Sequence, residues 1–326
     1  MKSQIKSRVA HLDTMRTLSM LWVVSILHMC SSLQGMPVLT SKFSNCITIT
    51  SLGSFTFLSG FFLANKVRSK QDIKAFYKAR LLRFYPLYFL SCVSMLYAQL
   101  LSHSSSMMTV RQFAFSIVGL GTIFGPSTIT LWYFSMLMVF YAITPLFSME
   151  YDTRKKVIVF ILSYLLLFAS TKWFSGDERM LMYYPVYVAS VFAGKKYRNY
   201  FLTSTINVKQ TLFAVLSFAL ACALYQVIEQ HTATIFVGII VAFCGAWLLF
   251  HLCRLISCSW VEKISLVMSY ASLVVYLFHS QMFWVCELIF GKFTLPIAYG
   301  VVLPLLFGGS WLVQKIYDSL LRRVKI

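Results

Sequence analysis

Long apolar segments recur along the chain and are separated by short polar stretches. A helix of roughly 20 mostly apolar residues crosses a hydrocarbon core about 30 Å thick. Ten segments reach or approach that length. They cover residues 12–33, 45–64, 84–101, 131–148, 157–172, 180–194, 211–228, 232–252, 264–288 and 295–316. The pattern therefore predicts an all-α polytopic membrane protein with about ten transmembrane helices.

One further apolar stretch does not predict a span. Residues 111–125 are interrupted by three glycines and followed by Pro126, so we expect a re-entrant or surface segment there. No loop in the sequence has the length of a soluble domain, and no internal repeat is evident. We expect one membrane-embedded domain over residues 1–326, with the first apolar run kept as an uncleaved span.

Composition supports a lipid environment. The chain is 59% hydrophobic and only 12% charged, whereas soluble domains carry about 25% charged residues. A soluble protein of this length could not bury so much apolar surface. The eight cysteines lie mostly in apolar runs and show no C-x-x-C or Cys/His pattern of the zinc type. We therefore expect neither disulfides nor a metal site.

The formal charge of +19 is explained by membrane topology. If the N-terminus is cytoplasmic and the sides alternate, 23 of the 29 Lys and Arg residues fall in cytoplasmic segments, including Lys2, Lys6 and Arg8. This asymmetry follows the positive-inside rule and predicts that both termini are cytoplasmic. Basic residues spread over several loops favour anionic membrane lipids as partners and exclude the single basic module of a nucleic-acid binder.

Polar groups inside the first span are candidates for chemistry. Asp13 and Arg16 lie near its cytoplasmic end at a spacing that allows an ion pair, and His28 lies towards its outer end. Charges within spans are costly and mark functional sites, although a place at the membrane surface also explains Asp13. His28 could take a proton from a hydroxyl or carry an acyl group. Because about 18 Å of helix separates Arg16 from His28, they would serve different halves of a cavity.

The basic segment 65–83 predicts two kinds of contact. Four lysines recur at a spacing of four residues and favour a helix that lies on anionic lipid. They are Lys66, Lys70, Lys74 and Lys78. Arg80 and Arg83 lie where the third span enters the bilayer. Two guanidiniums on one helix face form a fork that fits phosphate groups, so we expect a phosphate-bearing ligand to bind there.

Later spans carry weaker signals. Ser59 and Gly60 allow hydrogen bonds and close approach between helices. Trp132 and Tyr133 suit an aromatic belt at the outer interface. The ninth span has a polar stripe at helical spacing, which faces either an interhelical hydrogen-bond seam or a cavity. Its members are Ser265, Ser269, Ser272, Tyr276 and His279. The residues expected at the membrane interfaces are His103, His231, His251, Glu287 and Lys292.

Together these stretches resemble the acyltransferase 3 family of bacterial membrane enzymes, which includes O-antigen and other polysaccharide O-acetyltransferases. The matching stretches are L-D-T-M-R through His28, F-T-F-L-S-G-F-F, R-L-L-R-F-Y-P-L-Y, L-W-Y-F with Y-x-x-x-P, and S-L-V-V-Y-L-F-H. They occur in the family's order and cover most of the chain. The resemblance implies about ten spans, a cytoplasmic acyl-CoA such as acetyl-CoA as donor, and a lipid-linked or surface glycan as acceptor.

The resemblance also implies roles for individual residues. Arg16 and His28 would be the catalytic pair, and Arg80 with Arg83 would bind the donor. The residues that would line the cavity are Asp13, Ser59, Gly60, Trp132, Tyr276 and His279. Eleven residues separate Arg16 from His28, one more than the family usually has, which turns His28 about 120° from Arg16 on an ideal helix. A π-bulge of one residue would restore the alignment.

We therefore expect a multi-pass O-acyltransferase of the bacterial inner membrane. It would move an acyl group, most simply acetyl, to a hydroxyl of O-antigen in lipopolysaccharide or of another surface polysaccharide. Two alternatives remain. A transporter or flippase for a lipid-linked sugar would also need polar stripes and a basic inner face, although no inverted repeat supports it. A non-catalytic scaffold would tolerate alanine at the arginines and His28.

Overall fold

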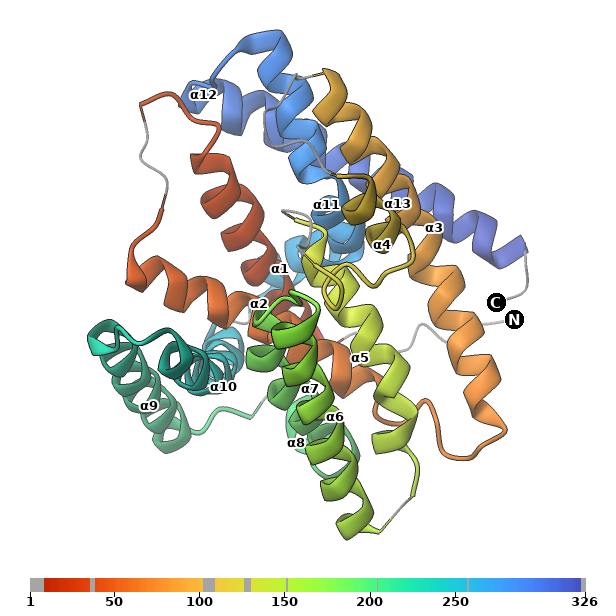
Figure 1. Ribbon diagram of the computed structural model, residues 1–326. Coiled ribbons are helices and arrows are strands. Elements are labelled where there is room, and N and C mark those ends of the chain that lie inside the picture. The colour runs from red at the N-terminus through yellow and green to blue at the C-terminus, as the bar shows by residue number, and fades with distance from the viewer. Residues whose placement is uncertain are drawn as a thin grey trace.

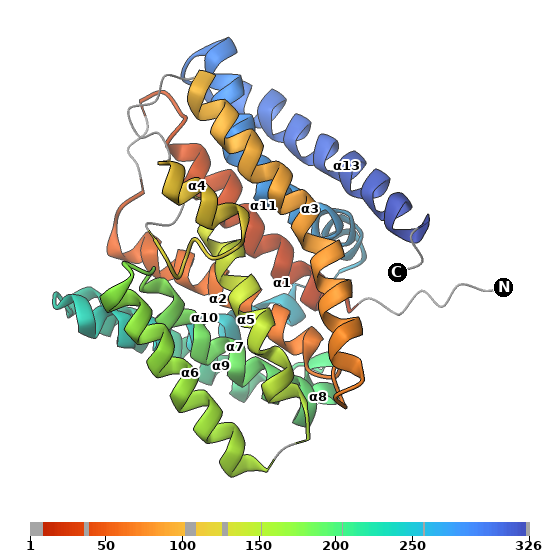
Figure 2. The same cartoon turned by 45° about the vertical axis from the view of Figure 1, so that its right-hand side comes forward.

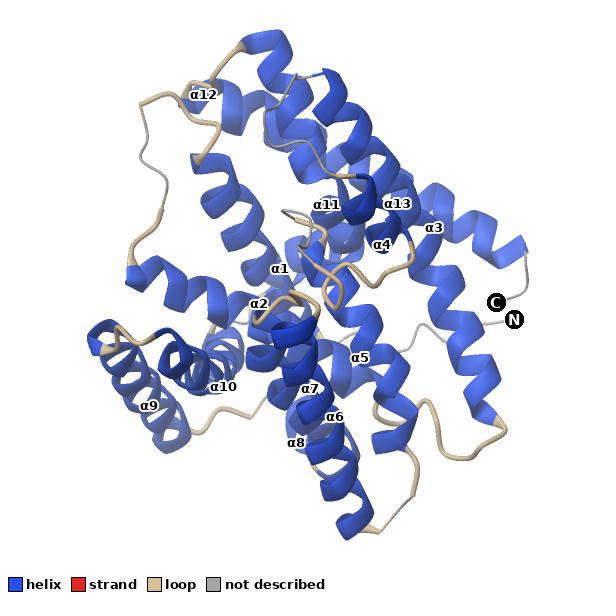
Figure 3. Ribbon diagram, viewed as in Figure 1, coloured by secondary structure: helices blue, strands red, loops and turns tan. Residues whose placement is uncertain are grey.

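The computed structural model shows a bundle of helices joined by loops (Figure 3). It describes residues 9–35, 39–101, 109–125, 130–150, 152–203, 205–256 and 258–323. Within these ranges the strand-like pairing that occurs is one isolated bridge, between Leu33 and Phe293. The helical fold class is therefore as the sequence predicts. Four residues named in the sequence analysis lie outside the described residues. They are Lys2, Lys6 and Arg8, which support a cytoplasmic N-terminus, and His103, which was expected at a membrane interface.

Every predicted span overlaps a helix. The helices are α1 (Ala10–Met20), the π-helix η1 (Leu21–His28), α2 (Lys42–Leu63), α3 (Asp72–Leu101), α4 (Val110–Ile117), α5 (Trp132–Ser148), α6 (Thr153–Trp173), α7 (Arg179–Lys196), α8 (Arg198–Leu202), α9 (Val208–Val227), α10 (His231–Leu255), α11 (Ser259–Phe290), α12 (Leu295–Ile297), the π-helix η2 (Ala298–Val302) and α13 (Leu303–Arg323). Among the described residues, length and apolar composition qualify seven segments to cross a membrane: α2, α3, α6, α9, α10, α11 and the continuous α12–η2–α13. The count of ten and the side of the termini stay predictions.

The segment 111–125 is not a span, as its glycines predict. Its helix α4 has only eight residues and is followed by turns. The Tyr88 hydroxyl donates to the carbonyl oxygen of Ser116 at 2.8 Å, and the Thr122 amide donates to the Ser135 hydroxyl at 3.2 Å. These bonds fasten the segment to α3 and α5.

Helix α1 and its continuation η1 occupy the centre of the bundle (Figures 1 and 2). On one side α1 packs against α11, which contacts α3 and α13. On the other side α1 packs against α2 and α10, which contact α7 and α9. Helix α5 touches α2, α3 and α7 and so bridges the two groups. Polar residues of the first helix are thus surrounded by protein, which lowers the cost of placing them in a membrane.

Helix α3 begins later than the lysine pattern predicts. The Asp72 carboxylate accepts hydrogen bonds from the backbone amides of Arg68 and Ser69, both at 2.9 Å, and these bonds hold the chain before the helix in a turn. Lys66 and Lys70 therefore precede α3, and the predicted four-lysine helix stripe is wrong for these two residues. The same continuous helix carries Arg80 and Arg83 in its third and fourth turns.

The end of the first helix is tied to the loop that follows α11. Gly291, at φ +70°, caps α11, and the chain then turns back beside the segment after η1. The Gln34 amide donates to the Phe293 carbonyl at 2.8 Å, and the Phe293 amide donates to the Ser32 carbonyl at 2.9 Å. The Lys292 ammonium adds a bond to the Ser31 carbonyl at 2.7 Å. This tie fixes η1 and α11 against each other at one end.

Candidate active site

The first helix changes from α to π geometry between the two residues that the sequence pairs. Residues Leu21–His28 form η1, which directly continues α1. A π turn closes its hydrogen bonds at i→i+5 and so holds about one residue more than an α turn. The extra residue between Arg16 and His28 is absorbed there. The structure thus has π geometry where a π-bulge would restore the alignment of Arg16 with His28.

Polar side chains of α1 form hydrogen bonds with α11. The Ser269 hydroxyl donates to the Asp13 carboxylate at 2.8 Å, and the Thr17 hydroxyl donates to the Ser265 carbonyl at 3.2 Å. Arg16 and Asp13 form the predicted ion pair, with 4.0 Å between nitrogen and oxygen. Asp13 is buried, so a position at the membrane surface does not explain it. Part of the polar stripe on α11 thus forms the seam to α1.

A cavity of about 820 Å³, called the chamber below, opens beside this seam. Its lining comes from α1, α2, α3, α5, α8, α11 and α13 and includes five Lys or Arg residues against one carboxylate, that of Asp13. The five are Arg16, Lys66, Arg80, Arg83 and Arg198. We call the end of the bundle that carries them the arginine end. Such a concentration of positive charge in a concave site favours a polyanionic ligand.

Arg80 is the most informative of these cations. Its guanidinium lies 5.6 Å from the ring centre of Phe84, and both residues line the chamber. Its Nε atom is enclosed and makes no hydrogen bond within the part of the chain that the structure describes. An enclosed donor without an acceptor is costly, and a phosphate oxygen in the chamber would remove that cost. Arg80 with Arg83 therefore fits the predicted fork for phosphate groups.

His28 and His279 meet at the opposite end of the bundle, called the histidine end below. The distance from His28 Nδ1 to His279 Nε2 is 2.6 Å, and the two rings are parallel with centres 4.8 Å apart. His279 is fully buried, whereas His28 is part-exposed. The two histidines are 251 positions apart in the chain. The fold thus places one accessible imidazole against one enclosed imidazole.

The partners of the rings assign their tautomers. His279 Nδ1 lies 2.7 Å from the carbonyl oxygen of Tyr276, which can only accept, so Nδ1 carries a proton. When both rings are neutral, His279 Nε2 is then an acceptor, and His28 Nδ1 donates to it. His28 Nε2 takes no part in these two hydrogen bonds, so its lone pair can accept a proton. The arrangement is that of a general base oriented by a second group.

Tyr276 connects the two ends. It lines the chamber, and its ring centre lies 5.6 Å from that of His279. Neither His28 nor His279 belongs to the lining described for the chamber. The candidate residues Asp13, Arg16 and Ser59 line it together with the two arginines of α3. The predicted residues therefore form one chamber and one histidine pair, separated by the ring of Tyr276.

Of the six residues predicted to line the cavity, Gly60, Trp132 and His279 are absent from the chamber lining. A Cβ atom on Gly60 would lie 2.0 Å from the Ser190 hydroxyl, which shows how closely α2 and α7 approach at this glycine. Trp132 is buried beneath the Arg179 guanidinium, 3.6 Å from its ring centre. Tyr133 is buried as well and lines the chamber. The predicted aromatic belt is therefore wrong, because tertiary contacts cover both rings.

A second buried polar cluster was not predicted. Arg254 is 2% exposed, donates to the carbonyl of Tyr200, and lies 4.0 Å from the ring centre of Phe250. His11 Nε2 lies 2.8 Å from the Phe201 carbonyl in the same region. His251 is 1% exposed and lies in the same region, close to the Tyr200 hydroxyl. This cluster joins α1, α8 and α10 and has the contacts of a structural support.

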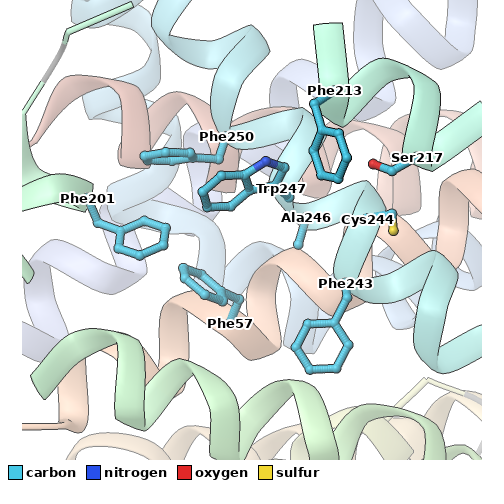
Figure 4. Close-up of a pocket in the computed structure, with 9 residues that line it drawn as sticks. All are labelled: Phe57, Phe201, Phe213, Ser217, Phe243, Cys244, Ala246, Trp247 and Phe250. Atoms are coloured by element: carbon cyan, nitrogen blue, oxygen red, sulfur yellow. The ribbon is translucent and has the colours of Figure 1, made fainter. Parts of the chain in front are cut away.

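A smaller pocket of about 360 Å³ lies between α2, α8, α9 and α10 (Figure 4). It is lined by Phe57, Phe201, Phe213, Ser217, Phe243, Cys244, Ala246, Trp247 and Phe250. Aromatic rings dominate this lining, which has no acid, histidine or cation. The pocket can hold an apolar group but offers no acid–base chemistry. No group of three or more His, Cys, Asp or Glu residues suited to a metal occurs among the described residues.

Sequence reasoning missed several chamber residues. Lys66 was assigned to a lipid-facing stripe, and Arg198 was counted only for topology. Phe55 lies in the F-T-F-L-S-G motif but has no polar group that would draw attention to it. Nothing in the local sequence distinguishes these residues from surface cations or from packing aromatics.

Comparison with known proteins gives one match. A family model described as an acyltransferase domain matches residues 9–315. No curated protein and no solved structure matches the chain. The matched range includes the whole lining of the chamber and both histidines of the pair.

Proposed function

The chain belongs to the acyltransferase family whose model matches residues 9–315, and from this premise we propose that it acylates a hydroxyl of a cell-envelope glycan. The donor is a cytoplasmic acyl-CoA, with acetyl as the acyl group. The acceptor is a lipid-linked or surface sugar, such as that of O-antigen or another polysaccharide, and the protein lies in the bacterial inner membrane. The observation that carries the proposal is the chamber with a basic end, whose wall at Tyr276 lies directly beside a histidine pair.

The arginine end binds the donor head. Arg80 and Arg83 provide planar donors that match phosphate oxygens, while Lys66 and Arg198 add positive charge around the opening. The arginine end would face the cytoplasm, in keeping with the positive-inside pattern of the sequence. From there the acyl arm extends along the chamber towards Tyr276.

His28 acts on the acceptor. Its Nε2 takes the proton of the sugar hydroxyl while the hydroxyl oxygen attacks the thioester carbonyl carbon. The new C–O bond forms, the C–S bond breaks, and the proton passes from His28 to the departing thiolate sulfur. In the alternative two-step route His28 Nε2 itself attacks the thioester carbonyl carbon, so an N–C bond forms and the C–S bond breaks to release the CoA thiolate. The sugar hydroxyl oxygen then attacks the acyl carbon, the N–C bond breaks, and the hydroxyl proton passes to the thiolate.

His279 and Arg16 support this chemistry from opposite ends. His279 Nε2 accepts from His28 Nδ1, which fixes the ring and stabilises the positive charge that His28 gains with the proton. Arg16 steadies the donor at its place on the chamber wall, where Asp13 holds it. Catalysis therefore needs both ends of the molecule in one folded chain.

The test uses the full chain in native membrane vesicles with radiolabelled acetyl-CoA, followed by mass analysis of the glycan. We expect glycan acetylation by the parent and its loss in His28→Ala and Arg83→Ala. His231→Ala and Arg154→Ala are matched controls, because both residues are exposed and lie outside the chamber lining.

Parental acetylation rates in correctly inserted His28→Ala and Arg83→Ala would contradict the proposed mechanism. Movement of a lipid-linked sugar without any release of CoA would favour the transporter alternative instead. If the purified protein acetylates no glycan and consumes no acyl-CoA, acyl-CoA is not its donor.

A further inference from the structure

Four aromatic rings close the chamber at the end towards the histidine pair. They are Phe55 of α2, Tyr133 and Phe134 of α5, and Tyr276 of α11, and all four line the chamber. The ring centre of Tyr276 lies 5.3 Å from Phe134, 5.6 Å from Tyr133 and 6.4 Å from Phe55. We call this group the aromatic end. Its contacts are those of rings packed directly on one another.

The aromatic end is held rigidly. The Tyr133 hydroxyl lies 3.0 Å from the Thr56 hydroxyl and donates to the Leu52 carbonyl at 3.1 Å. Tyr133, Phe134 and Tyr276 are buried, so neighbouring side chains restrict their movement. A rigid aromatic wall adapts less to a larger ligand than a wall of flexible side chains such as methionine. The volume available at this end is therefore set by the rings themselves.

The order of residues along the helices places the aromatic end between the donor head and the histidines. On α2 the lining runs from Leu63, near the arginine end, to Phe55, a separation of about 12 Å along the helix axis. On α11 Tyr276 is followed one turn later by His279. A ligand anchored by phosphates at Arg80 thus reaches the aromatic end with its far terminus.

We propose that the aromatic end is the acyl-binding subsite and that Phe55 and Phe134 restrict the donor to a short acyl chain. The proposal rests on the proposed function, since it assigns the part of the chamber that receives the transferred group. Each additional methylene would have to displace a packed ring. In a tight apolar pocket one methylene changes the specificity of an enzyme by roughly 10- to 200-fold.

Phe134 and Phe55 are suited to a test because their side chains are purely apolar. Truncating either one enlarges the aromatic end without removing a hydrogen-bonding group. Phe55 is only half-buried, so Phe55→Ala disturbs packing less than a change in the core does. Phe140→Ala is the matched control, because Phe140 is a fully buried ring of the same helix α5 that contacts Tyr184 and Tyr187 and does not line the chamber.

The experiment measures binding of acetyl-, propionyl-, butyryl- and hexanoyl-CoA to the purified full-length protein, with unacylated CoA as reference. Transfer from the same four donors to the glycan of native vesicles is measured in parallel. We expect the parent to discriminate against butyryl-CoA relative to acetyl-CoA by about tenfold or more. Phe134→Ala and Phe55→Ala should each reduce that discrimination about tenfold, and Phe140→Ala should leave it unchanged.

Equal use of long and short donors by the parent would overturn the acyl subsite, and so would an unchanged preference in variants that still transfer acetyl. A shift of the same size in Phe140→Ala would also overturn it, because it would reflect general loosening. If Phe134→Ala does not fold, Phe55→Ala decides. A parent that binds or uses no acyl-CoA at all contradicts the proposed function itself, which separates the two failures.

Discussion

Replacement of His279 by alanine gives the sharpest test of the histidine pair. His279 is fully buried and makes two bonds that matter here, one to the Tyr276 carbonyl at 2.7 Å and one to His28 at 2.6 Å. In His279→Ala the imidazole of His28 remains, but it loses the acceptor that orients its ring and its tautomer. We expect His279→Ala to lower kcat while the KM for acyl-CoA stays nearly constant, because His279 is absent from the chamber lining.

The size of the effect follows from the bond that is lost. A hydrogen bond to a charged group contributes about 1.5–3 kcal/mol, and about 1.4 kcal/mol corresponds to a tenfold change in rate. The expected loss of kcat in His279→Ala is therefore about 10- to 150-fold. His28→Ala removes the base itself and should cost about 10²- to 10⁴-fold.

The assay is steady-state release of CoA by purified, reconstituted protein in the presence of glycan acceptor. His279→Gln should recover part of the lost rate, because its amide oxygen can accept from His28 Nδ1. The double variant His28→Ala/His279→Ala should be no slower than His28→Ala alone, since His279 acts through His28. Parental kcat in His279→Ala, or additive losses in the double variant, would refute a positioning role.

Three further variants separate binding, packing and stacking. Arg83→Ala should raise the KM for acyl-CoA about 10- to 150-fold with a smaller change in kcat, because one charge-assisted contact is lost; a change confined to kcat would contradict this. Gly60→Ala should lower the Tm of the purified protein, because the added methyl would lie 2.0 Å from the Ser190 hydroxyl. Overpacking of this kind costs about 1–3 kcal/mol. In the control Gly308→Ala the methyl meets nothing within 4 Å, so the Tm should stay unchanged. Arg179→Ala should also lower the Tm, by removing a stack on Trp132 at 3.6 Å that is typically worth about 0.5–2 kcal/mol, and an altered KM for acyl-CoA would count against this reading.

Apolar runs and residue spacing predicted much of the fold. Each predicted span overlaps a helix, because the apolar length of a helix is a local property that lipid thickness dictates. The spacing between Arg16 and His28 is one residue longer than is usual in the family that the sequence resembles. A π-bulge was one way to restore their alignment, and a π-helix lies there. The Asp13–Arg16 pair was likewise predicted, as residues three apart on a helix are neighbours.

Other features depend on contacts between distant segments and could not be predicted. Trp132 has the sequence position of an interface aromatic, yet Arg179 covers it. Lys66 shares the spacing of a lipid-facing stripe, but the Asp72 cap excludes it from the helix and it lines the chamber. His279 was recognised as part of a stripe, whereas its bond to His28 follows only from the packing of α1 on α11.

The tie between the segment after η1 and the loop after α11 has a consequence for biosynthesis. A ribosome makes a chain from its N-terminus to its C-terminus, so the first helix is made long before His279, which lies 251 positions after His28. Until then the early helix lacks its partner. Premature termination before Phe293 would remove the backbone bonds that join the two ends. Chains that end before His279 therefore cannot form the histidine pair, and chains that end before Phe293 lack the tie that holds η1 beside α11.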